Sequence, residues 1–359
     1  MAAPPPQDGI DRLIALFTRG GYARVEPPVL QPADVFVDLS GEDIRRRLYA
    51  TQDAAGRALC LRPDYTIPVG RLHLETRAPA PAAYGYLGPV FRQQAEGTGE
   101  LLQAGIESIG RGDATAADAE VLALALEGLE ALGRGGRVRF GDMGLLDAVL
   151  EALEVGPAAR LRLARTVAGG RDPAATEGAR DQAGLLAAIE GQEPGAVRAL
   201  VEDVLSIAGI TSVGGRSAAE IAERFTARAA NRGGLPVERR AVLDRYLAIE
   251  GDPDRAAAEV RRLSAEAGLA VGAALDRFEE RTGFMAAAGL DVAALTFSGR
   301  FARGLDYYTG FIFEVLDGGG AGPLAAGGRY DRLLGALGSP EPVPAVGCAF
   351  WLDRVAGAA

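Results

Sequence analysis

The sequence predicts an α+β fold in which a mixed, mainly antiparallel sheet is flanked by helices and interrupted by a helical insertion. Strand-like runs occur near both ends of the chain, whereas residues 150–265 are rich in Ala, Leu, Arg and Glu with helical spacing. The 359 residues, 48% of them hydrophobic, can bury a large core. We therefore expect a disordered N-terminus over 1–7, one core over 8–150 and 266–359, and a helical insertion over 151–265.

The first third of the chain alternates helix and strand signals. Apolar residues at 10, 13, 14 and 17 predict a helix over 8–20, ended by a pair of glycines. Pro27 and Pro28 exclude a central strand, so 22–30 is expected at a sheet edge or an interface. Strand, turn and strand follow over 47–62, and a helix runs from 63 to 75.

The remaining core elements are predicted from similar patterns. Two strands over 84–92 and 101–109 are joined by a loop, a helix covers 116–132, and a strand covers 137–142. After the insertion we expect a helix over 271–289 and strands over 293–298, 310–316 and 346–350. The strands on both sides of the insertion then belong to one sheet.

Composition excludes several classes of protein. A formal net charge of -10 and a pI of about 4.9 argue against a nucleic-acid partner, so we expect no tRNA binding. The first residues lack the features of a signal peptide and no apolar run is long enough to span a membrane, which predicts a cytoplasmic protein. Cys60 and Cys348 are expected as buried, reduced thiols. One His and two separated Cys predict no metal site, and no cofactor is expected.

Three C-terminal segments carry a specific resemblance. They are Arg303-Gly-Leu-Asp-Tyr-Tyr-Thr-Gly310, Ala325-Ala-Gly-Gly-Arg-Tyr-Asp-Arg-Leu-Leu334 and Pro344-Ala-Val-Gly-Cys-Ala-Phe-Trp-Leu-Asp-Arg354. Together they resemble the histidine-recognition and motif 3 regions of class II histidyl-tRNA synthetases. The helix and proline-containing segment over 8–30 resemble motif 1, the dimer contact, and 84–109 resembles motif 2. The resemblance implies a class II aminoacyl-tRNA synthetase-like fold.

The segment Leu61-Arg-Pro-Asp-Tyr-Thr66 resembles the family's Leu-Arg-Pro-Glu-Gly-Thr, with a shorter acid. By this resemblance, Asp64 and Thr66 face the α-amino group of histidine. The alternative for Asp64 is a helix cap.

Gln103 and Glu107 lie four residues apart on a predicted strand, so both project from one face. They resemble the family's His-Gln-x-Gly-x-Glu, in which Gln103 would touch the main-chain end of histidine and Glu107 would accept a ring N–H. An exposed sheet face is the alternative.

The resemblance also assigns the opposite side of the pocket. Arg303 would pair with the ligand carboxylate and Tyr308 would contact the imidazole. Tyr307 is expected to point the other way on a strand, into the core. Tyr330 would form a wall, or alternatively anchor a turn after its glycines. His73 is expected as a surface or packing residue.

The nucleotide apparatus departs from the family. Arg92 and Arg354 match its ATP-site arginines and are interpreted as vestigial, because Gln94 replaces a Glu and Trp351 replaces a Gly. The loop over 95–100 is acidic and contains no Arg, which disfavours a triphosphate.

The sequence ends five residues after Arg354, where a synthetase would continue into an anticodon-binding domain of roughly a hundred residues. A kept histidine pocket with an altered ATP site resembles the family of ATP phosphoribosyltransferase regulatory subunits. This implies a non-catalytic chain that activates a short-form catalytic subunit, takes part in feedback inhibition by L-histidine, forms a homodimer through motif 1 and joins a hetero-octamer. The alternative is a truncated synthetase-like ligase that activates histidine for an acceptor other than tRNA.

Overall fold

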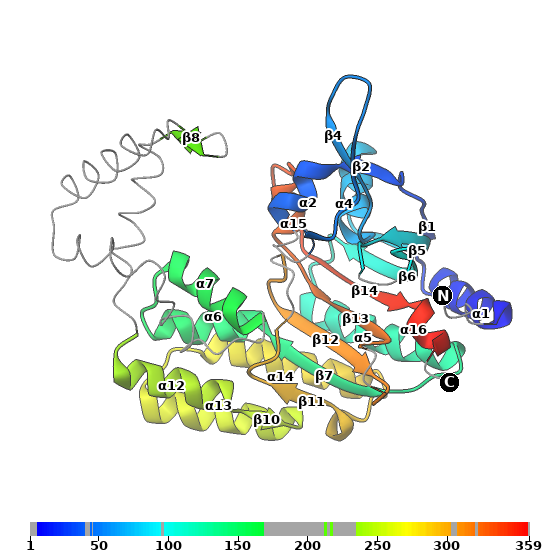
Figure 1. The fold of residues 1–359 in the computed structure, drawn as a ribbon. Coiled ribbons are helices and arrows are strands. Elements are labelled where there is room, and N and C mark those ends of the chain that lie inside the picture. The colour runs from blue at the N-terminus through cyan, green and yellow to red at the C-terminus, as the bar shows by residue number, and fades with distance from the viewer. Residues whose placement is uncertain are drawn as a thin grey trace.

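The computed structural model describes residues 6–39, 44, 46–94, 97–168, 212–213, 216–217, 235–302, 307–319 and 322–357. In this part of the chain, nine strands form one sheet (Figure 1). Their order is β1 (Ala23–Arg24), β5 (Ala82–Phe91), β6 (Glu100–Ile109), β14 (Ala345–Trp351), β13 (Ala325–Arg329), β12 (Phe311–Leu316), β7 (Arg137–Asp142), β11 (Thr296–Ser298) and β10 (Glu250–Gly251). The pairs β1–β5 and β7–β11 are parallel and the other pairs are antiparallel, which confirms the predicted mixed, mainly antiparallel sheet.

Helices cover one face of this sheet. The long helices α5 (Ala114–Ala131) and α14 (Gly272–Ala287) pack together behind the central strands (Figure 1). Phe140 of β7, Phe278 of α14 and Phe297 of β11 form an aromatic cluster with ring centroids 5.2–5.9 Å apart. Burial of such large apolar side chains is the main favourable contribution to folding, so this face holds the principal core.

Further helices extend the same core. They are α1 (Gln7–Arg19), α6 (Met143–Ala152), α7 (Pro157–Ala168), α12 (Val237–Leu247), α13 (Pro253–Ala267) and α16 (Leu352–Gly357). The helix α13 begins at Asp252, whose carboxylate accepts from Arg255 N, and ends at Gly268 with a left-handed φ of 65°.

A smaller layer lies over the other face. It contains a three-stranded sheet in the order β2 (Leu30–Pro32), β4 (Ala58–Leu61), β3 (Ala50–Gln52), together with α2 (Ala33–Leu39), α4 (Thr66–Glu75) and α15 (Leu333–Ala336). The β3–β4 hairpin projects at the top of Figure 1. Phe36, Ile67 and Leu334 belong to a second core cluster, which fixes this layer above one end of the main sheet.

The predicted elements are found with small shifts of their ends. The helix expected over 8–20 is α1, and the strands expected over 84–92 and 101–109 are β5 and β6. The strand expected over 293–298 is shorter, because Val292–Ala294 form a 3₁₀ turn before β11. Of the N-terminus predicted to be disordered over 1–7, residues 1–5 lie outside the described residues, whereas Gln7 is the first residue of α1. Residues 358–359 also lie outside the described part of the chain.

Within the range predicted as an insertion, the last part packs on the main sheet. Leu243, Tyr246 and Val260 from α12 and α13 are buried in the principal core, and β10 is the ninth strand of the sheet. Most of the range, 169–211 and 218–234, lies outside the described residues.

The strand β13 is absent from the sequence-based prediction. Its residues, Ala-Ala-Gly-Gly-Arg, lack the β-branched and aromatic side chains that mark strands, so local propensity does not predict a strand here. All five are nevertheless buried between β12 and β14. Tertiary packing has overridden local propensity here.

Cys60 and Cys348 are both buried and free, as expected. Within the described ranges, no helix is both long enough and apolar enough to cross a bilayer.

Candidate functional site

The face of the sheet opposite the long helices carries a floor of small residues. In the register of the central strands, Gly105 pairs with Ala349, which pairs with Ala326, and Gly347 pairs with Gly328. Of these residues, Ala326, Gly347 and Ala349 line a cavity of about 330 Å³ above the sheet. A cavity of this size is at the lower end of those that bind small molecules.

Glu107 lies behind the cavity wall and is 1% exposed. Thr66 donates to its Oε1 at 2.7 Å, and Tyr330 donates to its Oε2. Burial raises the pKa of Glu107 from 4.5 to about 8, although these hydroxyl groups act in the opposite direction. Thr66 and Tyr330 line the cavity, so two side chains of its wall are hydrogen-bonded to Glu107.

Two buried acceptors in the cavity wall lack hydrogen-bond partners among the described residues. They are Oδ2 of Asp64 and Oε1 of Gln103. Oδ1 of Asp64 accepts from Ile67 N at 3.3 Å, so this carboxylate also caps α4, and the two interpretations of Asp64 are compatible. Burial raises the pKa of Asp64, while Arg92 lowers it. An unpaired buried acceptor is costly, so a ligand with N–H donors fits this end of the cavity.

The side chains predicted on one face of β6 are brought together as expected. Gln103 and Glu107 are both buried, which excludes the alternative of an exposed sheet face. Tyr330 is buried against Tyr307, with ring centroids 5.8 Å apart. Its hydroxyl reaches the cavity wall, so it is more than the anchor of a turn.

Tyr307 and Tyr308 both line the cavity. Tyr307 is buried in the second core cluster, as predicted, but the expectation that it points away from Tyr308 on a strand is wrong. The two residues lie in the turn before β12, and their ring centroids are 5.0 Å apart. Two neighbouring aromatic rings therefore form part of the cavity wall. Arg303, predicted to bind the ligand carboxylate, lies outside the described residues.

The opposite end of the cavity holds residues that the sequence did not reveal. Arg139 of β7 is paired with Glu314 of β12 at 2.6 Å, and its guanidinium lies over the ring of Phe301 at 4.8 Å. Arg139 and Glu314 are 175 positions apart in the sequence, and only the antiparallel register of β7 and β12 brings them opposite each other. A local pattern contains no signal for such a pair.

The two arginines interpreted as vestigial occupy different places. Arg92 lines the cavity and donates from Nε to Pro63 O at 2.7 Å. Arg354 donates to Pro323 O at 3.0 Å and lies over the indole of Trp351 at 5.0 Å. Trp351 itself lines the cavity, so its ring occupies space that the expected glycine would leave open.

His73 is a packing residue, as predicted. It is buried on α4, and its Nδ1 lies 2.9 Å from the hydroxyl of Tyr84. Burial lowers the pKa of His73, so the ring is neutral near pH 7. It is not among the residues that line the cavity.

Comparisons with known proteins agree with this geometry. A family model described as histidyl-tRNA synthetase matches residues 7–200 and 196–355. The solved structure of an ATP phosphoribosyltransferase regulatory subunit/histidyl-tRNA synthetase from Bacillus halodurans has a TM-score of 0.70 at 24% identity, over 100% of this chain and 81% of that chain. A histidine–tRNA ligase subunit from Alicyclobacillus acidocaldarius has a TM-score of 0.60 at 26% identity, over 98% and 91%. These structures support the class II synthetase-like fold.

Sequence relatives are more specific. The ATP phosphoribosyltransferase regulatory subunit of Mesorhizobium japonicum is 42% identical over 355 residues, which cover 95% of this chain and 94% of the relative. The regulatory subunit of Agrobacterium fabrum is 40% identical over 359 residues, which cover 96% and 94%. The chain has a synthetase-like sheet and a cavity with two unpaired buried acceptors among the described residues, and it is similar to these relatives over nearly its whole length. It therefore belongs to the family of ATP phosphoribosyltransferase regulatory subunits.

Proposed function

We propose that this chain is the non-catalytic subunit that binds and activates a short-form ATP phosphoribosyltransferase, the first enzyme of histidine biosynthesis, and takes part in its feedback inhibition by L-histidine. The relatives that are 40–42% identical carry the name of this regulatory subunit. The altered nucleotide end of the cavity, where Trp351 and Arg354 contact each other, favours a regulatory role over the truncated-ligase alternative.

The observation that supports a histidine ligand is the pair of buried acceptors without partners, Asp64 Oδ2 and Gln103 Oε1. An α-ammonium group supplies N–H donors and a positive charge for both. Tyr330 and Thr66 direct their hydroxyl hydrogens to Glu107, so their oxygens can accept a ring N–H from an imidazole. Arg303 remains the proposed partner of the ligand carboxylate.

We propose a homodimer through the segment that resembles motif 1, and a hetero-octamer with the catalytic subunits. Val29 and Leu30 are large apolar residues exposed at the edge strand β2, with 38% and 50% exposure. A groove beside α1 includes Ile14 and Leu87. Large apolar side chains exposed to solvent and apolar grooves are typical of interaction surfaces. Loss of the dimer in Leu30→Asp, measured by sedimentation, tests this assignment.

The proposed setting is the cytoplasm, without tRNA. The two buried free thiols and the acidic net charge of -10 support this setting and this lack of a nucleic-acid partner.

The deciding experiment measures phosphoribosyl transfer by the short catalytic subunit from the same organism, with ATP and phosphoribosyl pyrophosphate, with and without this chain. A large increase in rate on addition is expected. An unchanged rate, under conditions where sedimentation shows a complex, removes the proposal; an unchanged rate with no complex removes the proposed partner.

Histidine is then titrated into the active complex. We expect inhibition by L-histidine to weaken when the cavity is altered by Asp64→Asn, while activation by the chain remains. Inhibition that is equal in the altered and unaltered complexes would place the histidine site elsewhere. Histidine-dependent ATP–pyrophosphate exchange by this chain alone would restore the ligase alternative.

A further inference from the structure

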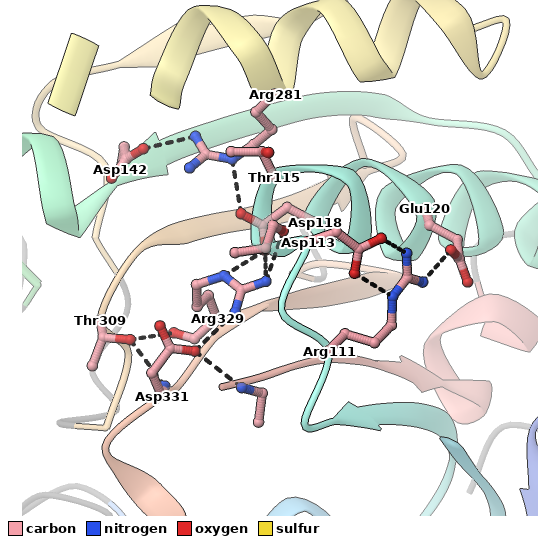
Figure 2. Close-up of polar contacts among 12 residues, drawn as sticks. Arg111, Asp113, Thr115, Asp118, Glu120, Asp142, Arg281, Thr309, Arg329 and Asp331 are labelled. Atoms are coloured by element: carbon pink, nitrogen blue, oxygen red, sulfur yellow. Dashed lines mark hydrogen bonds and ion pairs between the residues drawn. The ribbon is translucent and has the colours of Figure 1, made fainter. Parts of the chain in front are cut away.

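A network of buried charges lies behind the cavity, on the helical side of the sheet. Asp118, Asp142, Arg281 and Arg329 are 0–7% exposed, and none of them lines the cavity (Figure 2). They come from α5, the end of β7, α14 and the end of β13. The network therefore joins the two long helices to the strand that leads into Tyr330.

Asp118 is the centre of this network. Its Oδ1 accepts from Arg329 Nε at 2.8 Å and lies 2.7 Å from Nη2 of the same residue, while its Oδ2 accepts from Arg281 Nε at 2.8 Å. Arg281 continues to Asp142 Oδ2 at 2.7 Å, and Asp142 Oδ1 caps α6 at Leu145 N. Both oxygens of Asp118 are thus engaged by arginines from separate elements.

Hydrogen bonds of Arg329 also reach the two segments that carry Tyr308 and Tyr330. Arg329 Nη1 donates to Asp331 Oδ1 at 2.8 Å, so the residues before and after Tyr330 are linked to each other. Asp331 N donates to Thr309 Oγ1 at 3.0 Å, and Thr309 N donates to Arg329 O at 2.8 Å. Thr309 directly follows Tyr308, so the segments that carry Tyr308 and Tyr330 are held together (Figure 2).

The same carboxylate attaches this corner to β14. Asp331 Oδ1 also accepts from Ala345 N at 3.0 Å, the first residue of the strand that contains Gly347 in the cavity floor. Arg329 Nη2 further donates to Ala114 O at 2.8 Å, at the start of α5. The segments that form the walls and the floor of the cavity are therefore linked through Arg329 to the N-terminal end of α5.

Stability alone is a poor explanation for these charges. Desolvation of buried ions offsets much of their attraction, and well-packed apolar residues often stabilise a core equally well. What fixed, multiply bonded charges provide is a defined orientation of the groups that they contact. A cavity wall that must hold two hydroxyl groups at hydrogen-bond distance from a ligand needs that definition.

We propose that Asp118 is a positioning residue of the cavity, which acts through Arg329 and Asp331 to hold the segments of Tyr308 and Tyr330 in their binding arrangement. The proposal rests on the proposed function only in its choice of L-histidine as ligand. Asp118 touches no ligand in this arrangement, and its effect passes through the backbone of 307–310 and 329–331.

The test compares Asp118→Asn with Thr115→Val. Thr115 lies one turn before Asp118 and donates to Glu280 at 2.8 Å, so its replacement removes a hydrogen bond between α5 and α14 without touching Arg329. In Asp118→Asn we expect amide hydrogen exchange to become faster at Thr309, Asp331 and Ala345, with L-histidine affinity about tenfold weaker by calorimetry. Thr115→Val should change neither.

A second variant, Asp331→Ala, allows the same test if Asp118→Asn does not fold. The side chain of Asp331 is 39% exposed, so Asp331→Ala can remove the carboxylate that links Arg329 to Ala345 N without leaving a fully buried vacancy. The same local increase in exchange and the same loss of affinity are expected. In Asp331→Ala, the free energy of unfolding measured with urea should change less than the free energy of histidine binding. A general structural role of Asp331 would not produce this difference.

Three results would overturn the proposal. They are unchanged exchange at Thr309, Asp331 and Ala345 in both variants, faster exchange with unchanged histidine affinity, and an equal effect of Thr115→Val. If the unaltered chain does not bind L-histidine, the proposed ligand fails, and the exchange measurement still decides whether Asp118 holds the walls.

Discussion

The hydroxyl of Tyr330 donates a hydrogen bond to Oε2 of Glu107, although the two residues are 223 positions apart. Thr66 donates to the other oxygen from a different element, so Glu107 orients two hydroxyl groups of the cavity wall at once. An ionised Glu107 makes both hydroxyl oxygens acceptors toward the cavity, whereas a protonated Glu107 needs an acceptor itself. The charge on this residue therefore controls what the wall can bind.

At a pH above about 8, where Glu107 is ionised, Glu107→Gln should weaken binding of L-histidine by at least about tenfold and leave the fold intact, because an amide cannot accept from both hydroxyl groups equally well. Calorimetric titration checks affinity, and circular dichroism checks the fold. Glu75→Gln, at an exposed position of α4, is the matched control. Unchanged inhibition of the complex by histidine would contradict the assignment of this pocket.

Glu107 should also make stability depend on pH. Its pKa in the folded chain is about 8, above its ordinary value of 4.5, so the folded state binds the extra proton between these values. The free energy of unfolding should therefore fall as pH rises from about 5 to about 8, by at most about 1.4 kcal/mol per pH unit from this group. Urea unfolding at several pH values measures it. Glu107→Gln should flatten the profile in this range; an equally steep decline in that variant would refute this source.

Asp64→Asn should separate binding from stability. It removes a desolvated carboxylate whose Oδ2 has no partner among the described residues, so the free energy of unfolding of the ligand-free chain should stay equal or rise by about 1 kcal/mol. L-Histidine affinity should fall at least about tenfold, because the α-ammonium loses its counter-charge. Chemical denaturation and calorimetry measure the two effects. A stable variant with unaltered affinity would show that Asp64 does not contact the ligand.

Gly347→Ala tests the floor of the cavity. A Cβ there would overlap Oε2 of Glu107 and lie 2.5 Å from Ile106 O, so we expect a loss of about 3 kcal/mol or more in stability. Gly335→Ala in α15 is the control, because its Cβ would meet nothing within 4 Å and helix propensity favours Ala. Thermal unfolding of both variants checks the contrast. Similar behaviour of the two would mean that the sheet yields at Gly347.

The double variant Gln94→Glu with Trp351→Gly should not acquire histidine-dependent ATP–pyrophosphate exchange. It restores two family residues and opens space beside Arg354, but it supplies none of the loop cations that position a triphosphate. Exchange of labelled pyrophosphate into ATP is the measurement, with a histidyl-tRNA synthetase as positive control. A measurable rate would show that the loop cations are dispensable.

The sequence predicts those parts of the fold and site that local patterns encode. The two-residue period of β6 places Gln103 and Glu107 on one face, and the structure has both buried there. By contrast, β13 has a composition typical of a turn, and its place is fixed only by strands on both sides.

Contacts between distant elements could not be predicted either, because local sequence patterns do not encode them. Arg139 meets Glu314 because two strands pair in one register, and Arg281 meets Asp118 because α14 packs on α5. Neither pair leaves a periodic signal in the chain, since the spacing between partners reflects the lengths of everything between them. Resemblance to a known family predicted which residues would form a histidine pocket and said nothing of these contacts.

The small side chains of the floor make the open volume easy to lose. Ala326 and Ala349 line the cavity, and almost any substitution at either position adds atoms beyond Cβ. Each added atom would occupy part of the volume of about 330 Å³, so the size of the ligand that the chain can accept depends on a single carbon atom at each of these two positions.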